Sequence, residues 1–82
     1  LQPSAAPIRD REAEFLEKTI AVIDQHLADE TFGVEVLQQE IGMSRMQLHR
    51  KLKALTDQSA SDFIRYIRLQ RAADLLRQPG TP

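Results

Sequence analysis

Residues 34–55 of the 82-residue chain read VEVLQQEIGMSRMQLHRKLKAL, and they carry the clearest pattern of helices in the sequence. On both sides of one glycine, Gly42, apolar residues recur every three or four positions, which is the spacing of a single helix face. The stretch therefore predicts two short amphipathic helices, about 34–41 and 45–55, separated by a three-residue turn. Two helices joined this closely form a helix-turn-helix.

The residues around the turn support this division. Gly42 stands where the chain must leave the first helix in a left-handed conformation, which glycine adopts at the lowest cost. Ser44 is a good N-cap for the second helix, and Gly33 is a weaker N-cap for the first. The first helix is expected to turn three residues inward: Val34, Leu37 and Ile41.

The second helix has two different faces. The face expected to be buried carries Leu48, Leu52 and Leu55. The face expected to point outward carries Met46, His49, Arg50 and Lys53. One apolar face and one long, basic face are the layout of a recognition helix, because the major groove of DNA admits a single α-helix.

Two longer helices are expected on either side of this pair, about 11–28 and 60–77, which makes the chain all-α. The first carries an apolar stripe formed by Phe15, Leu16, Ile20, Val22, Ile23 and Leu27. Glu12, Glu14 and Glu17 are expected in its first turns, where the helix dipole favours negative charge. Phe32, just after this helix, is expected to reach the core.

Ser59 and Asp62 resemble a capping box at the start of the last helix. The apolar side of that helix is expected to consist of Phe63, Ile64, Ile67, Ala72, Leu75 and Leu76.

Composition restricts the function classes. The chain has no cysteine, which excludes disulfides and thiolate metal sites and fits a reducing cytoplasm. It has no apolar run long enough to span a membrane, so no membrane contact is expected.

The chain is expected to divide into three segments. Residues 1–10, with two prolines, are expected to be an interdomain linker, residues 11–78 a single DNA-binding subdomain, and residues 79–82 a tail.

The net charge of −1 hides a strong segregation along the chain. Residues 9–40 carry three basic and nine acidic groups, a net charge of −6. Residues 43–71 carry seven basic and two acidic groups, a net charge of +5. Because binding to a polyanion depends on the local field, the basic half remains compatible with DNA binding.

Three outward residues are candidates for contacts to DNA bases. Arg50 can bind both acceptors of guanine, His49 can hydrogen-bond to a base edge, and Met46 can pack against a thymine methyl group. Simpler alternatives stay open: an arginine paired with an acid of the first two helices, an ordinary exposed histidine, and a partly buried methionine. Six residues are candidates for phosphate contacts: Ser44, Arg45, Gln47, Lys51, Lys53 and Arg65.

Other chemistry finds no support in the sequence. The two histidines lie in different predicted helices, and neither has a second ligand at metal-binding spacing. No nucleophile–base pair or glycine-rich phosphate loop is present, so neither an enzyme nor a cofactor is expected. Arg68 and Arg71 are expected to pair with the acidic first helix rather than with a ligand.

The run from Ile41 to Leu76 resembles the first half of a DNA-binding domain of the AraC/XylS family. The residues that carry the resemblance are Gly42, Ser44, Leu48, Leu52, Thr56, Ser59 and the FIRYIRLQRA run at 63–72. Three positions depart from the family pattern: Gln38 replaces a usual alanine, Asp57 a usual glycine and Ala60 a usual proline. The resemblance is strongest to output domains of two-component hybrid sensors, and it places the base-contacting sites on Met46, His49 and Arg50.

The resemblance implies two helix-turn-helix units joined by a long helix, and the second unit is expected to be absent from this chain. It implies a transcription regulator whose partners are double-stranded DNA, an upstream receiver or sensor domain, and in one arrangement a second copy of itself. The resemblance also implies that this segment lies in the cytoplasm, where it could belong to the cytoplasmic part of a membrane-anchored hybrid sensor. The alternative is a helical protein–protein coupling module that makes no direct DNA contact.

Overall fold

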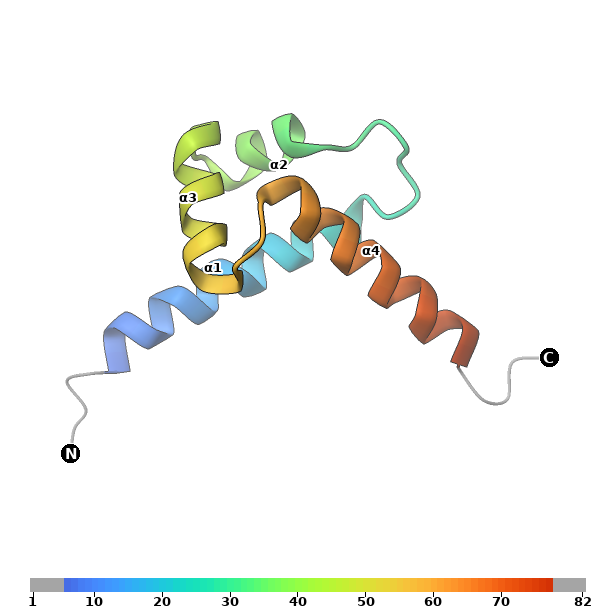
Figure 1. The fold of residues 1–82 in the computed structure, drawn as a ribbon, viewed down its shortest axis with the longest axis horizontal. Coiled ribbons are helices and arrows are strands. Elements are labelled where there is room, and N and C mark those ends of the chain that lie inside the picture. Colours follow the sequence, from blue (N-terminus) through green and yellow to red (C-terminus); the bar gives the residue numbers. More distant parts are fainter. Residues whose placement is uncertain (1–5, 78–82) are drawn as a thin grey trace.

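The computed structural model describes the backbone of residues 6–77 and the side chains of residues 10–77, and these residues form four helices and no strand. The helices are α1 (Ala6–Gln25), α2 (Val34–Ile41), α3 (Arg45–Thr56) and α4 (Ala60–Arg77). Figure 1 shows α2 and α3 together on one side of α1 and α4, whose outer ends diverge. The predicted all-α class, a helix-turn-helix unit followed by a long helix, is confirmed.

The helix boundaries agree with the prediction except in α1. The bounds of α2 and α4 match those predicted, and α3 is one residue longer. By contrast, α1 begins at Ala6 and ends at Gln25. Pro7 is compatible with this start, because a proline in the first turn lacks only an N–H that has no partner within the helix. The prediction of acidic residues in the first turn of α1 was therefore wrong.

The predicted linker at residues 1–10 overlaps α1 in residues 6–10. Its first five residues, and the predicted tail at 79–82, lie outside the described residues.

The core receives side chains from all four helices. Ile23, Leu37, Leu48 and Leu52 are completely buried, and Phe32 from the loop between α1 and α2 joins them as predicted. On α1 the buried face is centred on Phe15, Thr19, Val22 and Ile23, whereas Leu16 and Ile20 lie at its edge and Leu27 lies beyond the helix end. The Thr19 hydroxyl donates to the Phe15 carbonyl (2.8 Å), so this buried polar group has a partner.

The apolar side of α4 is only partly buried. Ala60, Phe63, Ile64 and Ile67 belong to the core, but Ala72, Leu75 and Leu76 are exposed, contrary to the prediction. The reason is visible in Figure 1, where the last turns of α4 extend past the other helices. Periodicity indicated the correct side of the helix but not how far the neighbouring helices reach.

The turn of the helix-turn-helix has the predicted caps. Gly42 is left-handed (φ 84°), and its amide donates to the Gln38 carbonyl (2.9 Å). Ser44 caps α3 by accepting from the Gln47 amide (3.1 Å). The end of α3 has the same left-handed conformation at Asp57 (φ 63°), although this residue is not a glycine.

We expect Asp57→Gly to raise the free energy of unfolding by up to about 1 kcal/mol, because a left-handed conformation costs an L-residue more than glycine. Little is lost in exchange, since the Asp57 side chain is 98% exposed and lies 4.0 Å from Lys53. Urea denaturation followed by circular dichroism measures the change. Asp57→Ala is the control, because it removes the charge but keeps the Cβ atom. A glycine variant no more stable than the alanine variant would contradict the prediction.

Candidate nucleic-acid interface

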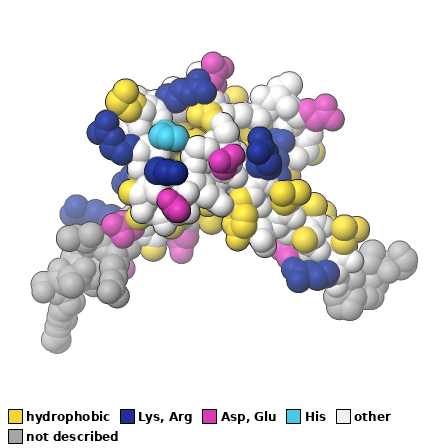
Figure 2. All heavy atoms as spheres, in the orientation of Figure 1, with side chains coloured by type: hydrophobic (Ala, Val, Ile, Leu, Met, Phe, Trp, Pro, Cys, Tyr) yellow, Lys and Arg dark blue, Asp and Glu magenta, His cyan; other side chains and the backbone are white. Residues whose placement is uncertain are grey.

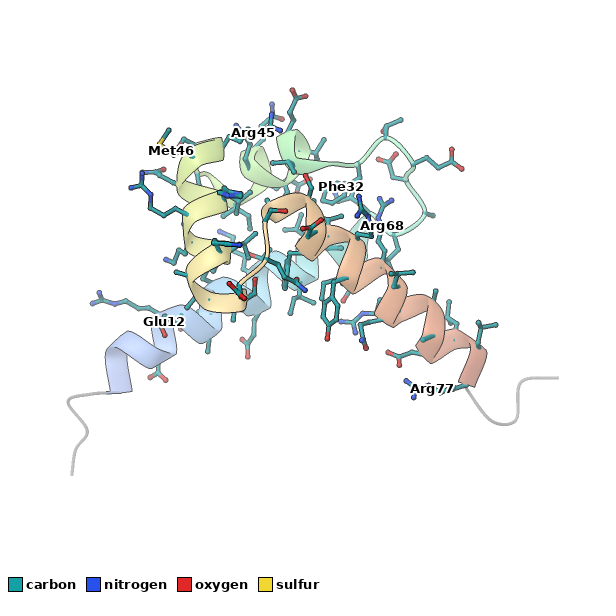
Figure 3. All side chains as sticks on the ribbon, viewed as in Figure 1. Glu12, Phe32, Arg45, Met46, Arg68 and Arg77 are labelled. Atoms are coloured by element: carbon teal, nitrogen blue, oxygen red, sulfur yellow. The ribbon has the colours of Figure 1, made fainter. Side chains whose placement is uncertain are left out.

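The packing of α3 fixes which side of it meets solvent. Leu48 and Leu52 are completely buried, and the opposite side presents Met46, His49 and Arg50. Met46 is 68% exposed, and Figure 3 shows its side chain pointing away from the other helices, which excludes the alternative that it belongs to the core. All three candidate base-contacting residues therefore share the outward face of one helix.

Two arginines of α3 carry charge that no acid neutralises at close range. Among the described side chains, no carboxylate lies within ion-pair distance of Arg45 or Arg50. The alternative in which Arg50 pairs with an acid of α1 or α2 is therefore not observed. An exposed arginine without an intramolecular partner keeps all five of its N–H donors for a ligand.

Gln47 is tied into the N-terminal cap of α3. The Gln47 amide donates to the Ser44 hydroxyl oxygen, and the Ser44 amide donates to the Gln47 side-chain oxygen, each at 3.1 Å. This reciprocal pair is a capping box, which the spacing Ser-x-x-Gln could have revealed in the sequence. The Gln47 side chain is therefore held beside the helix start, with its NH₂ group as its remaining donor.

The other candidate phosphate-contacting residues differ in how firmly they are held. The Lys51 ammonium lies 4.7 Å from the centre of the Phe15 ring on α1, a cation–π contact that links α3 to α1. Lys53 lies 4.0 Å from Asp57, and Arg65 lies 3.6 Å from Asp62 and is 73% exposed. Exposed pairs at these distances are weak, so Lys53 and Arg65 can exchange their partners for a phosphate.

Arg68 and Arg71 are both held by contacts within the fold, but only Arg71 makes the predicted pair with an acid of α1. The Arg71 guanidinium donates to both carboxylate oxygens of Asp24 (2.8 and 3.1 Å), and these hydrogen bonds raise the pKa of Arg71 above its ordinary value. Arg68 instead donates to the backbone carbonyls of Asp29 (2.8 Å) and His26 (3.4 Å). Both residues attach α4 to α1 and to the loop that follows it.

That loop is held by a compact polar cluster. The His26 ring stacks on Phe32 (4.6 Å between centres), and its Nε2 lies 3.0 Å from the Glu40 carboxylate of α2. The Thr31 hydroxyl (2.7 Å) and amide (2.9 Å) donate to Asp29 and lower the pKa of its carboxyl group. His26 thus joins the loop after α1 to α2, on a part of the molecule distinct from the outward face of α3.

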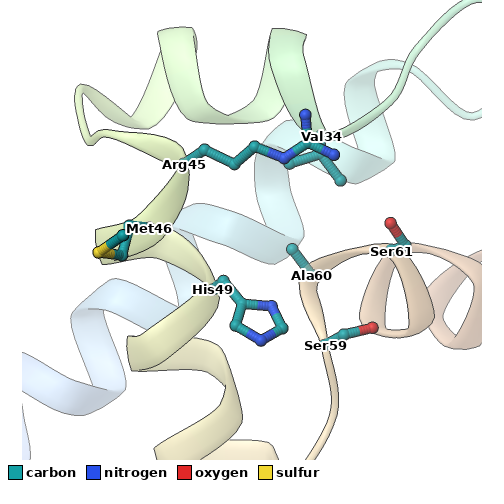
Figure 4. Close-up of a pocket in the computed structure, with 7 residues that line it drawn as sticks. All are labelled: Val34, Arg45, Met46, His49, Ser59, Ala60 and Ser61. Atoms are coloured by element: carbon teal, nitrogen blue, oxygen red, sulfur yellow. The ribbon is translucent and has the colours of Figure 1, made fainter.

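A groove of about 540 Å³ lies between the start of α3 and the start of α4. Figure 4 shows its lining residues, with the Arg45 side chain extending across toward Val34 at the start of α2. Met46 and His49 line the groove from α3, and Ser59 and Ser61 line it from the beginning of α4. Neither serine was identified from the sequence as a site residue, because only the tertiary fold brings them beside the outward face of α3.

The face seen in Figure 2 carries Lys and Arg side chains around α3 and the first half of α4, with acidic side chains interspersed among them. No helix between residues 6 and 77 combines the length and the apolar character needed to cross a membrane. Within the same range, no three His, Asp or Glu side chains come together as a metal site would require.

The known proteins that are similar to the chain include a histidine kinase and a regulatory protein. Histidine kinase P4 of Formosa agariphila is 38% identical over 76 residues, which are 93% of this chain and 6% of that protein. Regulatory protein SoxS of Escherichia coli K12 is 33% identical over 69 residues, 84% of this chain and 64% of SoxS. The chain thus spans a small part of the first protein and less than two thirds of the second.

No family model matches the chain, and no solved structure matches it significantly. Together with the four-helix fold, the two similar proteins support, in coarse terms, a helix-turn-helix unit of the AraC type.

Proposed function

We propose that the chain is a sequence-specific DNA-binding module of a bacterial transcription regulator, in which α3 enters the major groove. One observation carries the proposal: the outward face of α3 presents Met46, His49 and Arg50 to solvent. No carboxylate of the described side chains lies within ion-pair distance of Arg50, and Leu48 and Leu52 anchor the helix in the core. The similarity to a protein named as regulatory supports the same class of function.

The side chains divide between base and backbone contacts. Arg50 binds the O6 and N7 atoms of a guanine, His49 hydrogen-bonds to a neighbouring base edge, and Met46 packs against a thymine methyl group. Phosphate contacts come from Ser44, Arg45, Gln47, Lys53 and Arg65. We assign Lys51 to the contact between α3 and α1 instead, because its charge lies over the Phe15 ring.

The parent protein supplies the control. The similarity to part of a histidine kinase supports a multidomain regulator in which an upstream receiver or sensor domain sets when this module binds. Pairing of two modules would place two copies of α3 on adjacent sites of cytoplasmic DNA. In this proposal the module binds DNA and needs no catalytic step or cofactor.

A salt titration of DNA binding tests the proposal. Fluorescence anisotropy of the chain with a random-sequence duplex should give an affinity that falls as salt rises, because phosphate contacts release counterions. Three cationic phosphate contacts, Arg45, Lys53 and Arg65, predict a slope of roughly −3 in a plot of log K against log salt concentration. A flat salt response would rule out DNA as the ligand.

The alternative, a protein–protein coupling module, also has an observation in its favour. Tyr66, Leu69 and Leu76 of α4 are 45%, 64% and 88% exposed, and their spacing of three and seven places them on one side of the helix. Exposed apolar stripes mark docking surfaces in many proteins. This alternative predicts no salt-dependent DNA binding, so the same titration distinguishes the two functions.

A further inference from the structure

The groove beside α3 continues along the start of α4. Two further hollows, of about 250 and 330 Å³, adjoin it and share the lining residues Val34 and Ser61 with it. Together the three hollows form one depression, here called the Ser61 groove. It runs from Met46 and His49 on α3 to Phe32 and Arg68 beside the start of α2.

We propose that the Ser61 groove holds the sugar–phosphate backbone of the DNA strand that borders the major groove occupied by α3. This inference rests on the proposed function and specifies how the module is oriented on DNA. Because Met46 and His49 line the same groove as Ser61, a backbone held there lies directly beside the residues that face the bases.

The charges of the lining match a polyanion. Three arginines face the Ser61 groove, Arg45, Arg65 and Arg68, against a single carboxylate, Glu35. Among the described side chains, no carboxylate lies within ion-pair distance of Arg45 or Arg68, and Arg65 contacts Asp62 only at 3.6 Å. Arg68 is held instead by the backbone carbonyl of Asp29 (2.8 Å).

The uncharged lining suits the rest of the backbone. The exposed hydroxyl of Ser61 can donate to a phosphate oxygen at the point where all three hollows meet. Phe32 and Val34 provide an apolar floor, against which the carbon atoms of a deoxyribose can pack. Hydrogen-bond donors at the rim of the groove suit the phosphates of the DNA backbone, and an apolar floor suits its sugars.

Ser61→Glu tests the groove with little risk to the fold. A glutamate in the first turn of a helix is favoured by the dipole, so the thermal midpoint should be unchanged or slightly higher. The same glutamate puts a negative charge where the phosphate would lie, so affinity for the random-sequence duplex should fall by about tenfold or more, with the salt slope smaller by about one. Ser61→Gln is the control, because it has the same size without charge and should bind within about threefold of wild type.

A second pair of variants separates a local contact from long-range attraction. Arg65 and Arg77 both lie on α4, are 73% and 74% exposed, and contact an aspartate three residues earlier (3.6 and 3.0 Å). Arg77 does not line the groove. Arg65→Ala should weaken binding several-fold and reduce the salt slope by about one, whereas Arg77→Ala should leave both close to wild type.

The outcomes distinguish the groove from the function on which it rests. Salt-dependent binding by wild type, together with equal losses for Arg65→Ala and Arg77→Ala, would overturn the groove alone. So would equal binding by Ser61→Glu and Ser61→Gln. Absence of salt-dependent binding by wild type would overturn the proposed function, and the groove assignment with it.

Discussion

Replacing Leu52 with alanine is expected to lower the free energy of unfolding by about 2–5 kcal/mol, enough to leave much of this small domain unfolded. Leu52 is completely buried on α3, in a core to which all four helices contribute. The loss combines the burial of the missing methyl and methylene groups with a cavity that a closely packed core fills only in part. Because the chain is short, its total stability is expected at the lower end of the usual range.

Urea denaturation followed by circular dichroism measures this loss. Leu69→Ala is the matched control, because it removes the same atoms from a leucine that is 64% exposed on α4, and we expect it to change stability by less than about 0.5 kcal/mol. Equal losses for the two variants would mean that the four helices do not share the core described above.

Local signals explain why so much of the helix-turn-helix could be predicted from the sequence. A left-handed glycine at 42 and a serine cap at 44 act on their immediate neighbours, so the bounds of α2 and α3 follow from residues within a few positions. The start of α1 was missed because proline was taken as a linker residue, although the first turn of a helix accepts it.

Tertiary relations could not be predicted in the same way. Arg71 contacts Asp24, 47 residues away, and nothing local distinguishes Asp24 from the eight other acids between residues 9 and 40. Ser61 borders the outward face of α3 only because α4 starts beside it. The exposure of Leu76 likewise depends on where the neighbouring helices end. Sequence pattern indicated the face of each helix, and the fold determined what each face meets.

Replacing Arg50 with alanine is expected to weaken binding to a duplex selected from a random library by about 1–3 kcal/mol, roughly 5- to 150-fold. The expected loss is large because a guanidinium bound to guanine O6 and N7 makes two hydrogen bonds that alanine cannot replace. Anisotropy with the selected duplex, at constant salt, measures the change. The loss should not come from unfolding, since Arg50 is exposed and no acid lies within ion-pair distance of it among the described residues.

Two further variants assign the role of Arg50. Arg50→Lys keeps the charge but loses the forked geometry, so it should retain affinity for a random-sequence duplex while losing most of its preference for the selected one. Arg11→Ala removes an exposed arginine from the acidic α1 and should bind like wild type. If Arg50→Ala weakened binding to selected and random duplexes equally, Arg50 would be a phosphate contact. The reading of bases would then pass to Met46 and His49, since they share its outward face on α3.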